Sequence, residues 1–468
     1  MRVLVLGGGA REHAIAATLH RAGAAIYNVA ANANPGIERI AQATRRADPT
    51  RSDEVVEFAR AQRTEYAVIG PEAPLAAGVA DALRSADIPV VGPSQSAARI
   101  ESSKAFTRAL LTKYRIEASP KFVVVTRPEE LAAGTAKFSG PFVVKPAGLT
   151  AGKGVWVQGA DFETPAQGAA YAAGLLSSGG GPVVLEEKLE GEEFSLMAFV
   201  TDSGLYPMPA VQDYKRAQEG DQGSNTGGMG SYSQRDHLLP FLSRENYDRA
   251  FGVMQRTVQA LQKEGIPYRG ILYGGFMQTS RGPLLLEFNA RFGDPEGINV
   301  LALYEDGDFA KLLWGVAVGH VDPNLVRFRL RATVVKYVVP PGYGGAIRAG
   351  GIVTIDEPAI EADGVHVIYG SVEAVGGSHV RFSTSRGIAL VGEASAIHEA
   401  GTRVEAALSK VRGEYYVRHD IATKADLTNR VEHMRQLLAP AAKPSPLPLS
   451  VLPAGAPPSS AGSAEQLI

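Results

Sequence analysis

The stretch MRVLVLGGGAREHAIAATLHRAG, residues 1–23, joins a buried strand, three glycines and a helix. RVLVLGG has the continuous apolar run of a strand that is covered on both faces, and the segment from His13 forms the helix that follows. The pattern repeats to about Pro93: AAIYNVA, YAVIGPE and IPVVGPS are predicted strands, and SDEVVEFARAQ and GVADALRSA are predicted helices. Strands that alternate with helices predict a parallel sheet at the N-terminus.

The glycines at positions 7, 8 and 9 lie between that first strand and its helix. Backbone amides at a helix N-terminus suit a phosphate or another anion. A dinucleotide fingerprint would need a third glycine where Glu12 stands and an acidic residue after the second strand, where the chain reads Ala31-Asn32-Ala33-Asn34. This disfavours NAD and indicates a small phosphorylated substrate. The alternative is a tight turn without a ligand.

Composition limits the classes of function. A chain of 468 residues is expected to form about two to four domains. Its net charge of −2 offers no electrostatic footprint for nucleic acid or an anionic membrane, and no apolar run reaches the ~18 residues of a membrane helix. The absence of cysteine excludes disulfides, thiolate metal sites and a cysteine nucleophile. Together with an N-terminus that lacks a signal-peptide pattern, it predicts a cytoplasmic protein.

A second glycine-rich segment is FVVKPAGLTAGKGV, residues 142–155. Lys145 ends a strand, and Lys153 lies among Gly148, Gly152 and Gly154 before the next strand. Small residues let a loop fold over a triphosphate, and lysines supply point charges for its oxygens. Because Gly154 replaces the Ser or Thr of a P-loop and the spacing is one residue short, a mobile lid is predicted. The alternative is a flexible surface hairpin.

Two further segments have polar side chains next to strands. VVLEEKLEGEEFSL, residues 183–196, carries four acids between two strands; such a linker can pair with adenine and ribose, but on this segment alone a solvated acidic turn is favoured. QDYKRAQEGDQGSNTGGMGSYS, residues 212–233, has Asp213, Lys215 and Arg216 before a run of glycines. Consecutive free amides can form an anion nest, and a flexible loop is the alternative.

The most informative segment is GPLLLEFNARFGDPE, residues 282–296. Alternation along a strand predicts that Leu284, Leu286 and Phe288 face a core, while Leu285, Glu287 and Asn289 face the opposite side. Glu287 and Asn289 would then lie roughly 7 Å apart, at about 3.3 Å per residue. A carboxylate and an amide oxygen suit Mg²⁺, and Arg291 offers a bidentate fork for a carboxylate or phosphate. The alternative is an exposed polar strand end.

The remaining elements are predicted more coarsely. Residues 96–114 and about 247–264 are predicted helices, and short strands dominate residues 122–200. GILYGGFMQ and GPLLLEFNA are predicted to form a hairpin. A third region, about 331–420, contains strands and an amphipathic helix with Ile397, Val404 and Val411 on one face. The Pro/Ser/Ala-rich sequence from Ala439 onward cannot bury a core and is predicted to be disordered.

Taken together, these segments resemble the phosphoribosylamine–glycine ligase (glycinamide ribonucleotide synthetase) family of ATP-grasp enzymes. The resemblance covers about Met1 to Asp420. Seven motifs occur in family order: GGGAREHA from Gly7, GPEAPLAAGV from Gly70, GPSQSAARIESSKAF from Gly92, GLTAGKGV from Gly148, DYKR from Asp213, NTGGMGSYS from Asn225 and EFNARFGDPE from Glu287.

The resemblance implies an α/β and α+β multidomain fold. Its expected parts are a doubly wound N-terminal domain at 1–101, an ATP-grasp domain at 102–328 with a lid subdomain at about 122–192, a small C-terminal domain at 329–430 and a mostly disordered tail at 431–468. The expected cofactors are ATP and Mg²⁺, with Mn²⁺ as the alternative ion. Glycine and 5-phosphoribosylamine are the expected substrates, without nucleic-acid or membrane partners, for a monomer or small homo-oligomer.

The resemblance also assigns site residues. The metal pair falls on Glu287 and Asn289, and Arg291, Lys145 and Lys153 are the expected catalytic residues. ATP is expected to contact Lys104, Lys145, Glu186, Glu187, Lys188, Leu189 and Glu193. The expected substrate-binding residues are Gly8, Gly9, Asp213, Lys215, Thr226, Gly227, Gly228 and Arg291.

The implied reaction is ATP-dependent ligation of glycine to 5-phosphoribosylamine through glycyl phosphate. Three alternatives remain open. Another ATP-grasp ligase or carboxylase would differ at GGGAREHA and NTGGMG. An NAD-dependent oxidoreductase would need a third glycine and an acidic residue, and this chain lacks both. A nucleotide-binding scaffold without turnover would be free to lose Glu287, Asn289 and Arg291. Because this chain keeps all three, that alternative is disfavoured.

Overall fold

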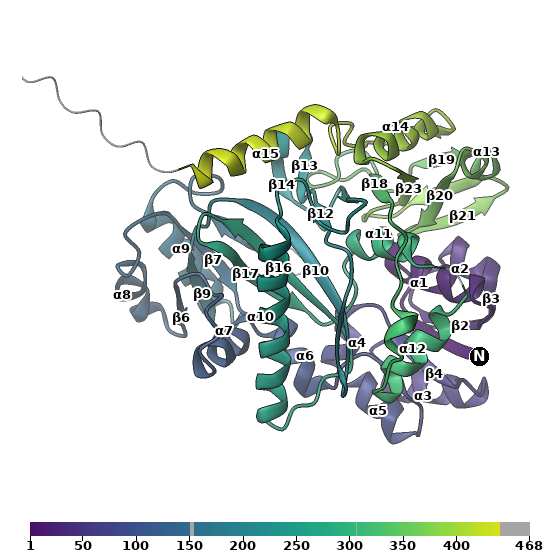
Figure 1. Cartoon of the computed structure of the whole chain (residues 1–468), viewed down its shortest axis with the longest axis horizontal. Coiled ribbons are helices and arrows are strands. Elements are labelled where there is room, and N and C mark those ends of the chain that lie inside the picture. Colours follow the sequence, from purple (N-terminus) through teal and green to yellow (C-terminus); the bar gives the residue numbers. More distant parts are fainter. Residues whose placement is uncertain (150–153, 306, 440–468) are drawn as a thin grey trace, which may run out of the picture.

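The computed structural model describes residues 1–149, 154–305 and 307–439. Its N-terminal part is a parallel sheet with the strand order β3-β2-β1-β4-β5, which confirms the predicted doubly wound arrangement (Figure 1). The strands are β1 (Arg2–Leu6), β2 (Ala25–Ala30), β3 (Ala41–Arg46), β4 (Tyr66–Ile69) and β5 (Val90–Val91). The helices are α1 (Ala10–Arg21), α2 (Pro35–Ile40), α3 (Ser52–Ala61), α4 (Glu72–Ala76) and α5 (Val79–Ser85).

Strand β3 was not predicted from the sequence. It reads AQATRR and has no buried residue, because it is the edge strand and pairs only with β2. Without an apolar alternation there is no periodic signal for a strand. Backbone pairing to β2 therefore decides its conformation.

The single helix predicted over residues 96–114 is wrong. The chain forms α6 (Gln95–Ser102) and α7 (Lys104–Lys113), separated by Ser103 in an extended conformation. The Ser103 hydroxyl accepts a hydrogen bond from the Phe106 amide at 3.2 Å and caps α7. The break places Lys104 in the first turn of α7.

A small antiparallel sheet, ordered β6-β9-β7-β8, occupies the region expected to be a lid subdomain. Its strands are β6 (Phe122–Val125), β7 (Phe142–Pro146), β8 (Trp156–Val157) and β9 (Val183–Glu187). Helices α8 (Leu131–Thr135) and α9 (Pro165–Ser177), neither of them predicted, pack on it and complete a separate hydrophobic core. The expected catalytic residue Lys153 lies outside the described residues.

The central sheet is antiparallel and ordered β11-β10-β16-β17. It contains β10 (Glu192–Thr201), β11 (Gly204–Pro207), β16 (Gly270–Thr279) and β17 (Gly282–Asn289), so the predicted hairpin is confirmed. Helices α10 (Arg244–Lys263), α11 (Glu296–Leu303) and α12 (Phe309–Val318) accompany it. Figure 1 shows α10 lying across this sheet.

The predicted alternation along β17 is only partly right. The pairing register shifts between Gly275 and Phe276, which pair with Glu287 and Leu285 and leave Leu286 without an opposite residue. This bulge reverses the facing of the preceding residues. Leu285 is therefore buried in the core, whereas Leu286 lines a cavity together with Glu287 and Asn289.

The glycine-rich segment 212–233 is largely paired. β12 (Gln212–Asp213) and β15 (Gly230–Ser233) join a sheet ordered β12-β15-β18-β23-β20, and β13 (Arg216–Gln218) pairs with β14 (Gln222–Asn225). The C-terminal part supplies β18 (Ala332–Val338), β20 (Val365–Tyr369), β23 (Ile388–Ala394) and α14 (Ile397–Leu408). A second sheet, β21-β22-β19-β24, contains β19 (Ile352–Ile355), β21 (Val372–Gly376), β22 (His379–Phe382) and β24 (Val411–Gly413), next to α13 (Glu357–Ala362).

The last described element is helix α15 (Lys424–Leu438), which lies along the top of Figure 1 beside β13 and β14. The expected mostly disordered tail from residue 431 is therefore wrong for residues 431–438, which continue this helix. The Thr423 hydroxyl caps the helix by accepting from the Asp426 amide at 3.2 Å. The rest of the expected tail, residues 440–468, lies outside the described residues.

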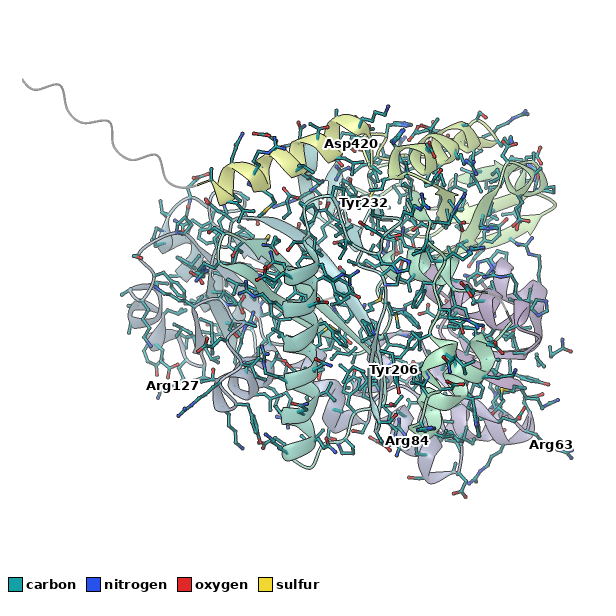
Figure 2. All side chains as sticks on the ribbon, viewed as in Figure 1. Arg63, Arg84, Arg127, Tyr206, Tyr232 and Asp420 are labelled. Carbon is teal, nitrogen blue, oxygen red and sulfur yellow. The ribbon has the colours of Figure 1, made fainter. Side chains whose placement is uncertain are left out.

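Side chains fill the space between these layers (Figure 2). One continuous core joins the N-terminal sheet, the central sheet and β18, and a second core lies within the C-terminal part. In the described part of the chain, no helix is long and apolar enough to cross a membrane.

The turn between β9 and β10 tests this architecture. Gly191 has φ +155°, and a Cβ at this position would lie 1.9 Å from the Gln278 carbonyl oxygen. We expect Gly191→Ala to lower the free energy of unfolding by about 1–3 kcal/mol. Gly174→Ala, in the open interior of α9, should instead raise it by about 0.5–1 kcal/mol. Equal effects of the two changes in urea denaturation would contradict this account.

Candidate functional site

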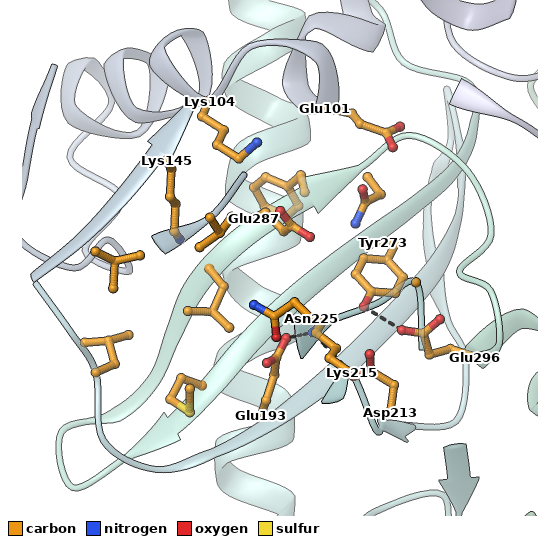
Figure 3. A pocket seen from close by; sticks show the side chains of 18 of the residues that line it. Glu101, Lys104, Lys145, Glu193, Asp213, Lys215, Asn225, Tyr273, Glu287 and Glu296 are labelled. Carbon is orange, nitrogen blue, oxygen red and sulfur yellow. Dashed lines mark hydrogen bonds and ion pairs between the residues drawn. The ribbon is translucent and has the colours of Figure 1, made fainter. Parts of the chain in front are cut away.

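A cavity of about 710 Å³ lies between the β6–β9 subdomain, the central sheet and the N-terminal domain. Its walls include most of the residues that the sequence singled out, from Lys104 and Lys145 to Arg291. Figure 3 shows Lys104 and Lys145 on one side of Glu287, with Lys215, Asp213 and Glu296 farther along the cavity. Segments far apart in the sequence thus meet in one place.

The end of β17 brings Glu287 and Asn289 into the cavity, as predicted. Burial alone would raise the pKa of Glu287, but the charges of Lys104, Lys215 and Lys145 outweigh it and hold that pKa below its ordinary value. Glu287 therefore stays ionised at neutral pH. A buried carboxylate surrounded by lysines is suited to a cationic ligand that also contacts phosphate.

Glu186 is held by two cations. Its carboxylate oxygens lie 2.7 Å from Arg108 Nε and 2.6 Å from Lys145 Nζ, and the side chains of Arg108 and Glu186 are each 2% exposed. Burial would raise the pKa of Glu186, but Arg108 and Lys145 lower it to about 2. Its carboxylate therefore positions Lys145, whereas the sequence had suggested a contact with the nucleotide. No local pattern on α7 predicted Arg108.

Lys104 begins α7 and faces the same region. Its amide donates to the Ala147 carbonyl at 2.9 Å, and its Nζ lies 3.4 Å from the Gly148 carbonyl. Burial, helped by the nearby charge of Lys145, holds the pKa of Lys104 below its ordinary value, although the charge of Glu287 acts in the opposite direction. The two lysines thus lie next to the glycine-rich segment that follows β7.

The segment expected to bind adenosine forms one wall of the cavity, from Glu186 to Leu189 and at Glu193. Glu187 accepts from the Lys121 amide at 2.9 Å and from Arg281 at 2.8 Å, and Lys188 Nζ donates to the Gln158 carbonyl at 3.1 Å. Glu193 pairs with Lys215. The charged side chains of this wall therefore have protein partners already, which leaves its backbone and Leu189 for a flat base.

The expected substrate loop is ordered by its own hydrogen bonds. Thr226 Oγ1 donates to the Lys215 carbonyl at 2.9 Å and accepts from the Gly228 amide at 3.1 Å. Thr226 and Gly227 line the cavity and Gly228 does not. Because the Gly228 amide bonds within the loop, the predicted anion nest has one donor fewer.

Arg386, from the C-terminal part, fastens this loop from outside. Its guanidinium donates to the Gly228 carbonyl at 3.2 Å and to the Asp294 carbonyl at 2.7 Å, and pairs with the Asp294 carboxylate at 3.0 Å. It also lines the cavity. The sequence analysis missed Arg386 because its partners lie about 90 and 160 residues away along the chain.

The first glycine cluster does not line the cavity. The Gly9 amide donates to Glu12 at 2.7 Å, and the Gly8 carbonyl accepts from Asn32 at 2.9 Å and Asn34 at 3.0 Å. Glu12 thus supplies the anion at the start of α1 from within the chain. Arg11, which pairs with Glu12 at 2.7 Å and donates to the Phe292 carbonyl at 3.1 Å, reaches the cavity instead.

Arg291 lies between two acids that the sequence analysis did not select. Its Nη2 is 3.0 Å from Glu101, and its Nε is 3.6 Å from Glu72. Burial would lower the pKa of Arg291, but Glu101 and Glu72 raise it. The buried Nε has no hydrogen-bond partner among the described residues. Arg291 is therefore held in place by the two acids, and its Nε–H donates no hydrogen bond to a described residue.

A group of buried polar side chains continues past Arg291. Tyr273 donates to Glu296 at 2.8 Å and lies 2.6 Å from the Ser195 hydroxyl (Figure 3). Burial and the nearby charge of Glu296 raise the pKa of Asp213 well above its ordinary value. The sequence analysis missed Glu296 and Tyr273, since only the fold brings β16 and α11 to β12.

Two family models and several curated relatives match this chain. The model for the phosphoribosylglycinamide synthetase N domain matches residues 1–101, and the model for the ATP-grasp (A) domain of that synthetase matches residues 102–297. Phosphoribosylamine–glycine ligase of Methanothermobacter thermautotrophicus is 46% identical over 442 residues, which cover 93% of this chain and 100% of the relative. The corresponding ligase of Methanoregula boonei is 44% identical over 438 residues, with the same coverage.

Solved structures share the fold of this chain. The crystal structure of phosphoribosylamine–glycine ligase from Thermotoga maritima matches with a TM-score of 0.75 and 30% identity, covering 90% of this chain and 100% of that one. A biotin carboxylase from Campylobacter jejuni matches with a TM-score of 0.70 but only 13% identity, covering 93% and 98%. The second likeness shows a shared fold alone.

The buried triad Arg108–Glu186–Lys145 makes a pH-dependent contribution to stability. Since the folded pKa of Glu186, about 2, lies below its ordinary 4.5, the stabilisation is complete above 4.5 and is lost as pH falls toward 2. We expect Glu186→Gln to lower the free energy of unfolding by about 3–5 kcal/mol at neutral pH. The difference from the unmodified protein should shrink below pH 4.5. The exposed control Glu190→Gln should change little, and a Glu186→Gln deficit independent of pH would contradict the assignment.

Proposed function

Because the chain belongs to the phosphoribosylglycinamide synthetase family, we propose that the cavity described above is where it ligates glycine to 5-phosphoribosylamine at the expense of ATP. The protein is an ATP-dependent carboxylate–amine ligase of purine biosynthesis, and its products are glycinamide ribonucleotide, ADP and phosphate. The observation that carries the choice of site is the end of β17, where Glu287 lies beside Lys104 and Lys145 and Asn289 lines the same cavity.

ATP is proposed to lie between the β6–β9 subdomain and the central sheet. The wall from Glu186 to Leu189 would contact the adenine, and Glu193 the ribose. The ion pair between Lys145 Nζ and the Glu186 carboxylate, at 2.6 Å, fixes the position of the Lys145 ammonium group. Lys104 and Lys145 would supply positive charge to the phosphates. Their positive charge favours transfer of the γ-phosphoryl group, in which positioning and electrostatics contribute most of the catalysis.

A divalent ion is proposed at Glu287 and Asn289. The described residues contain no cluster of three or more His, Asp or Glu side chains that could hold a metal without other ligands. One carboxylate and one amide nevertheless fit Mg²⁺, since this ion usually keeps several waters and shares phosphate oxygens with its substrate. When bound, it would neutralise phosphate charge. Mn²⁺ is the alternative ion, with the same oxygen ligands.

Arg291 is proposed to hold the carboxylate of glycine. Its buried Nε donates no hydrogen bond to any described residue, although Glu72 lies within ion-pair distance of it at 3.6 Å, and Glu101 holds Nη2 at 3.0 Å. One glycine carboxylate oxygen attacks the γ-phosphorus, the bond to the bridging oxygen breaks, and ADP leaves with glycyl phosphate remaining. Water must be kept away from that acyl phosphate, which a site buried between two sheets favours.

5-Phosphoribosylamine is proposed to enter from the side of the N-terminal domain. Its amine attacks the acyl carbon of glycyl phosphate, and phosphate leaves. Asp213, Lys215, Thr226 and Gly227 line the cavity and are the proposed contacts for this substrate, whereas Gly8, Gly9 and Gly228, which were also expected to bind it, do not line the cavity. Arg11 also reaches this side and supplies a positive charge for the sugar phosphate.

The proposed division of the chain follows from these roles. We assign residues 1–101 and 102–328 to substrate and nucleotide binding and 329–430 to a C-terminal domain that shares a sheet with β12 and β15. The enzyme is proposed to act in the cytoplasm, where ATP and sugar phosphates are available, as a monomer or small homo-oligomer. Fractionation and light scattering would test these two proposals.

The metal assignment predicts loss of turnover without loss of fold. Glu287→Gln and Asn289→Leu should each reduce ADP release by at least about a thousandfold, because several kcal/mol of charge stabilisation are lost. Melting temperatures should stay close to that of the unmodified protein. The control Glu245→Gln, on the exposed side of α10, should keep full activity. Near-normal turnover of either variant at ordinary Mg²⁺ concentrations would rule out the pair.

The substrate assignment predicts that ADP release requires glycine and 5-phosphoribosylamine together. Alanine should react weakly and larger amino acids hardly at all, since a tight pocket gains about 1–3 kcal/mol against one added methyl group. Phosphoribosylamine would be made in situ and each amino acid added in turn. If ADP formed equally well with bicarbonate or formate in place of glycine, the assignment of the ATP site would stand, but the assignment of glycine as the acid substrate would be wrong.

A further inference from the structure

Helix α15 lies outside the regions matched by the two family models, yet one of its side chains reaches the cavity. Arg430 lines the cavity wall, and its side chain is only 12% exposed. We propose that Arg430 is a positioning residue for ATP, and that α15 acts as a strap which holds the two segments carrying Glu193 and Lys215. This inference rests on the proposed nucleotide site.

The guanidinium of Arg430 joins three acids from different places. Its Nε lies 3.1 Å from Asp426 one turn earlier on α15, its Nη1 3.0 Å from Glu192 at the start of β10, and its Nη2 3.0 Å from Asp221 beyond β13. The planar fork of arginine suits several acceptors at fixed angles, which the single ammonium of lysine does not. Arg430 therefore connects α15 to the start of β10 and to the turn between β13 and β14.

Tyr214 is the second point of attachment. Arg430 lies over its ring at 4.6 Å from the centroid and Arg418 at 5.1 Å, and its hydroxyl bonds to Asp426. The ring of Tyr214 is buried. Two guanidinium groups near one buried ring favour a fixed orientation of the segment that carries it.

The strap holds residues in or next to the cavity wall. Glu192 and Asp221 line the cavity themselves, and Tyr214 lies between the cavity residues Asp213 and Lys215. Fixing the side chains of Glu192 and Tyr214 also fixes the backbone from which Glu193 and Lys215 project. Glu193 and Lys215 then pair with each other across the cavity wall. Through these neighbours, Arg430 sets the position of the proposed ribose contact.

A second contact supports the same arrangement. His433, one turn after Arg430, lies 2.7 Å from the other oxygen of Glu192, and Gln212 donates to Glu192 at 3.1 Å. Gln212 also donates to the Glu193 carbonyl at 2.9 Å. The start of β10 is thus held through the Glu192 side chain and the Glu193 carbonyl, and Arg430 supplies the only guanidinium within ion-pair distance of Glu192 among the described residues.

Titration calorimetry of ATP binding to the full-length protein would test the strap. Arg430→Met should raise the Kd for ATP by about tenfold, because one partner of a buried charged network is lost. Arg430→Lys keeps the charge without the fork and should give an intermediate Kd. Arg435→Met is the matched control: this residue lies on the same helix, is exposed and pairs with Glu432, so its Kd should be unchanged.

Melting temperatures of the same variants separate positioning from simple stabilisation. A variant of Arg430 that melts earlier but binds ATP with an unchanged Kd would overturn the proposal, as would equal effects of Arg430→Met and Arg435→Met. Since ATP binding is measured without glycine or phosphoribosylamine, the result does not depend on turnover. Failure of the ligase reaction in the unmodified protein would count against the proposed function and leave the strap to be judged by its own Kd values.

Discussion

The buried ion triad of Arg108, Glu186 and Lys145 is the interaction on which the site depends. Arg108 belongs to α7, Glu186 to β9 and Lys145 to β7, and Arg108 also donates to the Leu285 and Leu286 carbonyls of β17 at 3.1 and 2.9 Å. One guanidinium thus fastens the small subdomain to the central sheet at the β17 bulge, next to Glu287. Charges this deeply buried are tolerated only when every partner is in place.

Buried hydrogen bonds join the N-terminal domain to the C-terminal part of the chain. The buried imidazole of His13 on α1 accepts from the Tyr369 amide at 2.9 Å, and Asn34 donates to the Tyr369 carbonyl at 2.7 Å. Burial lowers the pKa of His13 to about 3, so the ring stays neutral and can accept that bond at any physiological pH. The C-terminal part is therefore docked on the N-terminal sheet, and from that position Arg386 reaches the substrate loop.

Charge in the cavity is balanced between elements that are remote in sequence. Lysines from α7, β7 and the segment after β12 surround Glu287 on β17, while Glu101 and Glu72 from the N-terminal domain neutralise Arg291. Arg291 of the ATP-grasp domain is compensated by Glu72 and Glu101 of the N-terminal domain, and Arg386 and Arg430 of the C-terminal part pair with Asp294 and Glu192. The cavity therefore exists as a functional site only when the domains are packed together, which explains why its residues are spread from position 11 to position 430.

The sequence by itself determined the parallel N-terminal sheet, the β16–β17 hairpin and the motifs at Lys145 and Glu287, because apolar periodicity and strand ends are local patterns. It could not determine the β17 bulge, the edge strand β3 or the break at Ser103, since these follow from pairing and capping with little apolar signal. Arg108, Arg386 and Arg430 were equally invisible: a surface arginine and a buried one look alike in sequence. Only the tertiary structure, by bringing their distant partners within hydrogen-bond distance, decided which arginines build the site.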